Sequence, residues 1–128
     1  MKKLLPLLLL IIPSVSLSQS LFYCEVMQVV ERSAYGEIVS NQDSQNDQVG
    51  STFTVNKATG EIAGSYFINN ATAFDIEIVV NTGTDFIVVS KSAGDYVGYF
   101  SIHFNSFSDK YLFTYTSSGQ WISTGTCF

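Results

Sequence analysis

Hydrophobic and polar residues alternate with a period of two over several short stretches of the chain. From Phe74 to Val80 the even-numbered positions are apolar, whereas Asp75 and Glu77 fall on the opposite face. Between Tyr96 and Phe104 the apolar side chains share a face with Gly98. A strand with one face in a core and one in water has this period, as antiparallel sheets allow. The pattern predicts antiparallel β-structure.

Short glycine-containing segments separate the alternating stretches and predict tight turns. They are Asn56–Gly60, Asn81–Gly83, Ser92–Asp95 and Ser117–Gly119. Glycine supplies the positive φ that such connections need, so neighbouring stretches should form hairpins. Between these turns the pattern predicts eight strands, at residues 21–31, 51–56, 61–69, 74–81, 85–91, 96–104, 110–117 and 120–127. The almost wholly polar segment from Ser40 to Gly50 predicts a mobile surface loop.

Composition supports an all-β fold. In residues 19–128, Val, Ile, Thr, Phe, Tyr and Trp number 47, against 24 for the strong helix formers Ala, Leu, Glu, Lys, Arg, Gln and Met. No window shows a sustained helical period. We therefore predict one all-β domain at residues 19–128, an antiparallel up-and-down barrel or two-sheet sandwich of about eight strands. Its core should include Phe53, Phe74, Phe100 and Phe104.

The N-terminus has the pattern of a signal peptide. Two lysines precede an apolar run from Leu4 to Ile12, which Pro13 ends. Small residues follow, and Ser16 and Ser18 fit the positions that a signal peptidase reads. We expect a signal peptide at residues 1–18, with cleavage after Ser20 as the alternative. A membrane-spanning helix needs about 20 apolar residues, more than this run supplies.

The chain has two cysteines, Cys24 and Cys127. In an exported protein such a pair predicts a disulfide, here between the two ends of the mature domain. Two free thiols are the alternative. A disulfide requires the two Cα atoms within about 7 Å, and a closed barrel brings its first and last strands together. The cysteines therefore favour a closed meander.

Charge excludes some partners. Removing residues 1–18 takes away two of the six basic residues and no acidic ones, so the formal charge moves from −5 to −7. That is the wrong sign for binding nucleic acid or an anionic membrane surface. We expect neither partner, and no membrane span after the signal is removed.

Few residues could perform catalysis or bind a metal, and we expect no enzyme activity, metal or cofactor. His103 is the single histidine, and no Gly-x-Ser-x-Gly motif accompanies it. Asp75 and Glu77 fit solvated carboxylates better than a glycosidase pair. Alternate oxygen-bearing residues in the polar segment faintly resemble a calcium loop that lacks its glycine and its final glutamate, at Asn41, Asp43, Gln45 and Asp47.

Aromatic residues suggest the one candidate binding surface. Tyr99 and His103 share the polar face of one predicted strand and could form an exposed patch for a partner or a glycan. Ordinary surface residues are the alternative. The terminal Phe128 raises the alternative of an outer-membrane barrel, but the residues before it on its face match that pattern poorly.

The segments Phe53–Gly60, Gly98–Ser101 and Ser123–Cys127 resemble a loose set of short, uncharacterised exported bacterial β proteins with one disulfide. The resemblance implies a secreted or periplasmic location and no functional residues. The leading hypothesis is a non-enzymatic binding module that holds a small apolar ligand in a barrel mouth, or a protein partner on a sheet face. The alternatives are a structural or adhesive subunit that assembles through strand edges and, last, a small enzyme.

Overall fold

The computed structural model describes residues 20–118 and 121–128, which form one antiparallel sheet. The predicted signal peptide at 1–18 lies outside these residues. The strands are β1 (Leu21–Arg32), β2 (Ile38–Ser40), β3 (Thr52–Asn56), β4 (Ile62–Ala63), β5 (Asp75–Asn81), β6 (Asp85–Ser92), β7 (Tyr96–Asn105), β8 (Lys110–Ser117) and β9 (Trp121–Cys127); α1 (Gln42–Gln48) follows β2.

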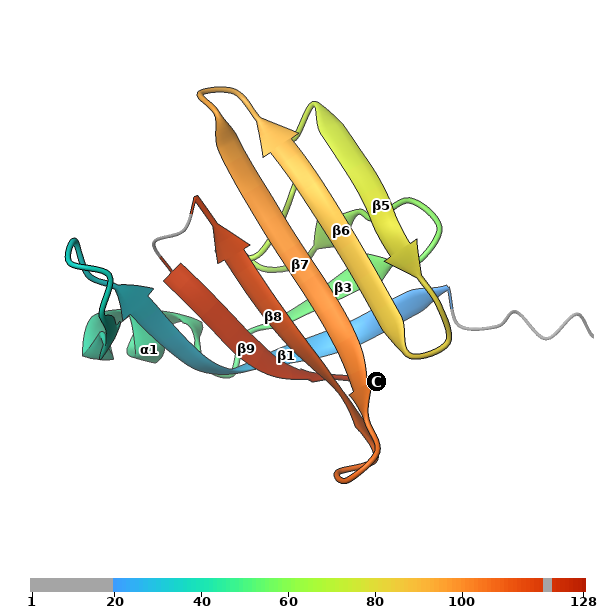
Figure 1. Cartoon of the computed structure of the whole chain (residues 1–128), viewed down its shortest axis with the longest axis horizontal. Helices are drawn as coiled ribbons and strands as arrows, with labels where there is room; N and C mark the ends of the chain where they lie inside the picture. Colours follow the sequence, from blue (N-terminus) through green and yellow to red (C-terminus); the bar gives the residue numbers. More distant parts are fainter. Residues whose placement is uncertain (1–19, 119–120) are drawn as a thin grey trace, which may run out of the picture.

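The sheet curls into a half-barrel with the strand order β4-β3-β1-β9-β8-β7-β6-β5 (Figure 1). Strands β5 to β9 run up and down through successive hairpins, and β9 then pairs with β1. The short β2 pairs with the far end of β1. The all-β, barrel-like prediction is thus confirmed, including the adjacency of the first and last strands in chain order. The closed meander is not formed, because β4 and β5 at the two ends of the sheet do not pair.

The two ends of the sheet approach each other through side chains instead of a ladder. Gly60, in the β3–β4 turn, lies so close to β5 that a Cβ there would meet the side chains of Ile76 and Ile78 at 3.0 and 3.2 Å. The Asn81 amide also donates to the Lys57 carbonyl at 3.4 Å. Contact between these walls covers the core where strand pairing is missing.

Two β-bulges help the sheet to curl. One lies in β1 opposite β9, between Val26 and Gln28, and the other lies in β5, between Ile78 and Val80. A bulge adds one residue to one strand and increases the local twist. The extra side chains, Met27 and Val79, are more than half exposed. The inward-facing pattern therefore resumes correctly after each bulge.

The core fills the concave side of the sheet. Among the residues that the structure describes, fifteen buried apolar ones form one cluster, with Val26, Val29 and Val55 fully inaccessible. Phe53 packs edge-on against Phe100 and Phe113, with ring centroids 5.8 and 5.0 Å away. Such pairs add about 0.5–1.5 kcal/mol beyond the area they bury.

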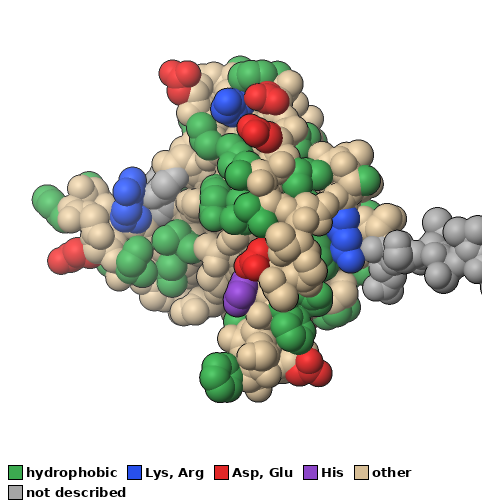
Figure 2. Space-filling view, turned by 45° about the vertical axis from the view of Figure 1, so that its right-hand side comes forward, with side chains coloured by type: hydrophobic (Ala, Val, Ile, Leu, Met, Phe, Trp, Pro, Cys, Tyr) green, Lys and Arg blue, Asp and Glu red, His purple; other side chains and the backbone are tan. Residues whose placement is uncertain are grey.

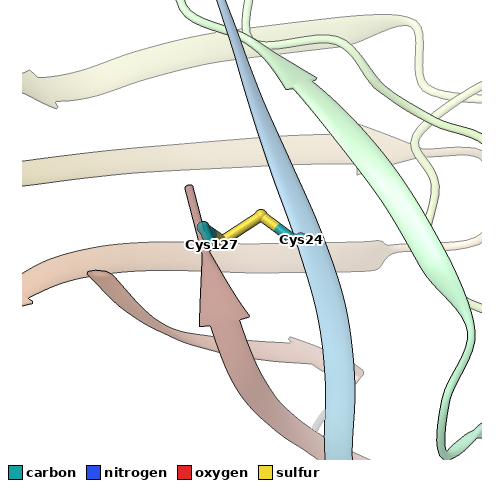
Figure 3. The surroundings of a disulfide bond; sticks show 2 residues. All are labelled: Cys24 and Cys127. Atoms are coloured by element: carbon teal, nitrogen blue, oxygen red, sulfur yellow. A yellow bond between two sulfur atoms is a disulfide. The ribbon is translucent and has the colours of Figure 1, made fainter. Parts of the chain in front are cut away.

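The disulfide predicted from the sequence joins Cys24 of β1 to Cys127 of β9 (Figure 3). The two residues are directly opposite each other in the ladder, with their Cα atoms 4.1 Å apart, and both are 2% exposed. The bond crosslinks β1 to β9, the first and last strands in chain order.

Two segments differ from the sequence-based prediction. The strand expected at 61–69 is only Ile62–Ala63, because side chains replace the ladder beyond it: the Ser65 hydroxyl accepts from the backbone N–H groups of Phe67 and Ile68. The loop expected at 40–50 contains α1, whose N-cap is Asn41, with its side chain accepting from Ser44 N.

One core residue was also predicted wrongly. Phe53 and Phe100 are buried and Phe104 is partly buried, but Phe74 is 74% exposed. Phe74 lies just before β5, the edge strand, and alternation along a strand does not show how far the opposite wall extends. Asp75 and Glu77 are exposed, as expected. Within 20–118 and 121–128, no helix is long and apolar enough to cross a membrane.

Candidate functional site

A cavity of about 530 Å³ lies at one end of the half-barrel. Many of its lining residues come from the ends of β6 and β8 and the starts of β7 and β9, which lie toward the upper left of Figure 1. Small-molecule sites commonly measure about 300–1,000 Å³. The lining combines hydroxyls, amides and aromatic rings and carries no formally charged side chain: Gln48, Phe67, Asn69, Asn70, Thr72, Ser90, Ser92, Ala93, Tyr96, Gly98, Tyr115, Ser117, Ser118, Trp121 and Ser123.

Four buried polar residues lie in this lining. Gln48 at the end of α1, Asn70 in the loop after β4, Ser90 in β6 and Ser123 in β9 are only 3, 4, 7 and 3% exposed. They are the buried polar residues of the described chain, and they all lie at one site. Burying polar groups is costly unless they find partners, so their concentration at a cavity requires an explanation.

Asn70 has a structural explanation. Its side-chain oxygen accepts from Ile62 N at 2.8 Å, and its amide nitrogen donates to Gly60 O at 2.9 Å. These bonds hold the irregular loop after β4 against the β3–β4 turn and so shape one wall of the cavity. Within the described residues, the side chains of the other three polar residues make no such hydrogen bonds to the backbone.

Gly98 leaves room for the buried polar side chains of Gln48, Ser90 and Ser123, which form the floor of the cavity. A Cβ at this position would lie 2.6 Å from Ser90 Oγ and 3.6 Å from Tyr115 Oη. Gly98 in β7 pairs with Ser90 of β6 on one side and with Ser117 of β8 on the other, so it lies between the strands that carry these hydroxyls. Any larger residue would displace the Ser90 hydroxyl and fill the floor.

Aromatic side chains form much of the wall and rim. Tyr96 and Trp121 are 58 and 43% exposed, whereas Tyr115 is 8% exposed. Burial raises the pKa of Tyr115, against a smaller opposite effect of its hydrogen bond with Ser117. Its hydroxyl therefore stays neutral at physiological pH and can both donate and accept a hydrogen bond.

Tyr99 and His103, the surface predicted from the sequence, lie elsewhere. Both are on β7 with exposed side chains, on the face opposite Phe100 and Ile102, which belong to the core. They therefore belong to the convex face, away from the cavity. Figure 2 shows the single histidine at the surface beside an acidic side chain and close to a group of hydrophobic ones.

His103 pairs with Asp85 across β6 and β7. Its Nδ1 lies 2.6 Å from Asp85 Oδ1, and Thr84 Oγ1 donates to the other carboxylate oxygen at 2.7 Å. The hydrogen bond with His103, followed by that of Thr84, lowers the pKa of Asp85 from its ordinary value of 3.8. A depressed carboxylate pKa stabilises the fold above the unfolded-state pKa, and this stabilisation is lost as the pH falls through the folded-state pKa.

We expect the His103→Ala variant to raise the pKa of Asp85 toward its ordinary value, because the largest cause of the depression is removed. The fold's stability in this variant should then fall off less steeply below pH 3.8. Carboxyl-detected NMR titration measures the pKa directly. Leu112→Ala, which changes the residue opposite His103 on β8, is the control and should leave the titration unchanged. An unaltered Asp85 titration in His103→Ala would contradict this account.

The sequence contained a signal for the cavity that the alternation analysis did not use. Ser90 shares a face with Phe86 and Val88, and Ser123 likewise lies on an inward face. Gly98 stands inside a strand, where glycine often marks a close approach. Each interrupts an apolar face with a small or polar residue. Their convergence at one end depends on strand register, which the alternation does not give.

The polar segment that resembled a calcium loop has other roles. Asn41 caps α1 and also donates through Nδ2 to Glu31 Oε2 at 2.7 Å, which ties the helix to β1. In the described ranges, no three His, Cys, Asp or Glu side chains lie close enough to hold a metal ion.

Comparisons with known proteins give no further guide. No protein-family model, no curated protein and no solved structure matches the chain. Function must therefore be argued from the cavity itself.

Proposed function

We propose that this protein is a non-enzymatic binding module, exported to the periplasm or beyond the cell, that holds a small ligand in the cavity at the end of its half-barrel. The observation that carries the proposal is the gathering of Gln48, Ser90 and Ser123 at the floor of a cavity of ligand size. A fold stabilised by its core alone would place apolar side chains at these positions.

The chemistry of the lining supports binding over catalysis. Hydroxyls, amides and aromatic rings give orientation and affinity without transferring protons at neutral pH. The Tyr115 pKa is raised, which takes its phenol further from the range in which a general acid or base works. The signal peptide predicted from the sequence and the disulfide support a location outside the cytoplasm.

The edge strands favour a binding module over assembly through strand edges. β5 and β4 terminate the sheet, and β4 has only two residues. β5 carries Asp75 and Glu77 on its exposed face and contains a bulge. Short, charged and bulged edges are the features that discourage pairing with another chain. The convex surface with Tyr99 and His103 stays a prediction for a protein partner.

The test uses Gly98→Ala, which places a methyl group on the cavity floor. We expect ligand-observed NMR against a library of small metabolites to find compounds that bind the oxidised protein, and Gly98→Ala to abolish their binding. Gly83→Ala is the matched control, because a Cβ at Gly83 meets nothing within 4 Å. Both variants should keep the fold, since neither glycine has a positive φ and the methyl group at Gly98 meets the Ser90 hydroxyl instead of the backbone.

Two results would overturn the proposal. One is a library without any compound whose binding depends on Gly98. The other is sedimentation that shows concentration-dependent multimers, with the cavity end of the molecule buried between copies. A monomer with Gly98-dependent ligands supports the proposal.

A further inference from the structure

The floor of the cavity holds polar atoms that are not used by the fold. Ser123 Oγ donates to Gln48 Oε1 at 3.4 Å, a long bond. Among the hydrogen bonds of residues 20–118 and 121–128, none involves Ser90 Oγ or Gln48 Nε2. Yet every fully buried side-chain nitrogen or oxygen in those ranges has a partner. Ser90 Oγ and Gln48 Nε2 must therefore reach open space in the cavity.

These atoms select against an apolar ligand. An apolar ligand on the floor would exclude water from Ser90 Oγ and Gln48 Nε2 and leave both atoms without hydrogen-bond partners. Binding would then cost the full desolvation free energy of both groups. A ligand that bonds to them avoids that cost. The cavity floor therefore favours a ligand with polar groups over the apolar ligand that was expected from the sequence.

The same lining selects against an ionic ligand. None of the cavity residues carries a formal charge, and Tyr115 stays neutral. A buried charge needs an opposite charge or several strong hydrogen bonds to offset its lost hydration. Ser, Asn, Gln and Tyr groups both donate and accept, which suits ligand hydroxyls, since these also do both.

The rim adds an apolar surface of aromatic rings. Tyr96 and Trp121 are partly exposed beside the cavity, and Phe67 packs against the core from its wall. A ligand that matches both rim and floor has one flat apolar face and several uncharged hydroxyl groups. Sugar rings have this combination, with C–H groups on a face and hydroxyls around the edge.

We propose that the ligand is an uncharged saccharide of one or a few rings, stacked on the aromatic rim with its hydroxyls bonded to Ser90, Gln48 and Tyr115. This inference rests on the proposed function and specifies the chemical class of its ligand. Gly98 is the position that leaves room for the hydroxyl groups of the floor.

Trp121 makes the test direct, because it is the single tryptophan of the chain and lies at the cavity. Its fluorescence is titrated with glucose, N-acetylglucosamine, maltose and cellobiose. Glucuronate is the charged match, cyclohexanol is a ring with a single hydroxyl, and uridine is a neutral ligand of another class. We expect saturable binding of at least one neutral sugar, at least about tenfold tighter than glucuronate.

Single substitutions on the floor then separate a specific role from a structural one. Ser90→Ala and Gln48→Leu should each weaken sugar binding about three- to tenfold, the effect of one neutral hydrogen bond. Both should weaken the binding of cyclohexanol less than that of the sugars, because cyclohexanol has one hydroxyl and the sugars have several. Ser101→Ala on the convex face of β7 is the control and should change neither ligand.

The outcomes distinguish the two proposals. If cyclohexanol, glucuronate or uridine binds in a Gly98-dependent way and tighter than every sugar, the binding module stands and the saccharide inference fails. If no compound shows Gly98-dependent binding, the proposed function itself fails. Sugar binding that ignores both Ser90→Ala and Gln48→Leu also overturns the inference.

Discussion

The Gly125→Ala variant is expected to lose most or all of its folded stability, a change of more than about 4 kcal/mol in the free energy of unfolding. Gly125 in β9 pairs with Val26 of β1 on one side and Phe113 of β8 on the other. A Cβ there would overlap the Glu25 carbonyl oxygen and lie 2.7 Å from the Phe113 ring, closer than real Cβ contacts allow. The carbonyl is backbone and cannot move away without breaking the ladder.

Chemical denaturation monitored by circular dichroism measures this loss in the free energy of unfolding. Gly83→Ala is the control, because it adds the same methyl group in open space, and its stability should stay within about 0.5 kcal/mol of the parent. The close approach lies beside the β1 bulge. Because the Phe113 ring also contacts this position, the loss of stability should be accompanied by exposure of Phe113. A Gly125→Ala protein with near-parent stability would show that β1 and β9 are not held this tightly.

Removing the disulfide should have the next largest effect. In the double variant Cys24→Ala, Cys127→Ala we expect the free energy of unfolding to fall by about 2–5 kcal/mol. The bond spans a sequence separation of 103 residues, and a long closed loop restricts the unfolded chain most in the entropic model. It also crosslinks the ladder between β1 and β9, the first and last strands in chain order.

The parent protein treated with a reductant is the matched comparison, because it loses the bond while keeping both side chains. It should be destabilised to a similar extent, and the double variant should be insensitive to the reductant. Equal stability of parent and double variant would mean that the β1–β9 ladder suffices without the crosslink. Both forms should retain strand-rich circular dichroism under native conditions.

Period-two alternation predicted the long hairpins well because their strands have one wet and one dry face. The strand from 96 to 104 is an example: Phe100 and Ile102 are buried and His103 is exposed, as its pattern requires. The same reasoning failed after Ala63, where Ser65 and Asn70 bond to the backbone and remove the need for a ladder. It also missed α1, because a seven-residue polar helix has too few apolar residues to show a period.

The candidate site was less accessible to sequence reasoning. The sequence predicted a binding surface at Tyr99 and His103 because an aromatic residue and the single histidine share a polar face. Both residues lie on the convex surface. The residues of the cavity are mostly serines and amides, which are common in loops and strands alike. Their meaning depends on neighbours such as Gly98 and Ser90, which are adjacent only through strand pairing.

The sequence by itself determined the strand-rich class of this protein, most of its hairpins and the pairing of Cys24 with Cys127. Those features follow from local alternation, turn residues and the small number of cysteines. Tertiary structure alone decided that the sheet stays open, that it contains two bulges, and that Ser90 and Gln48 meet at one cavity. The reason is that register and curvature come from contacts between strands far apart in the chain, which no local pattern records.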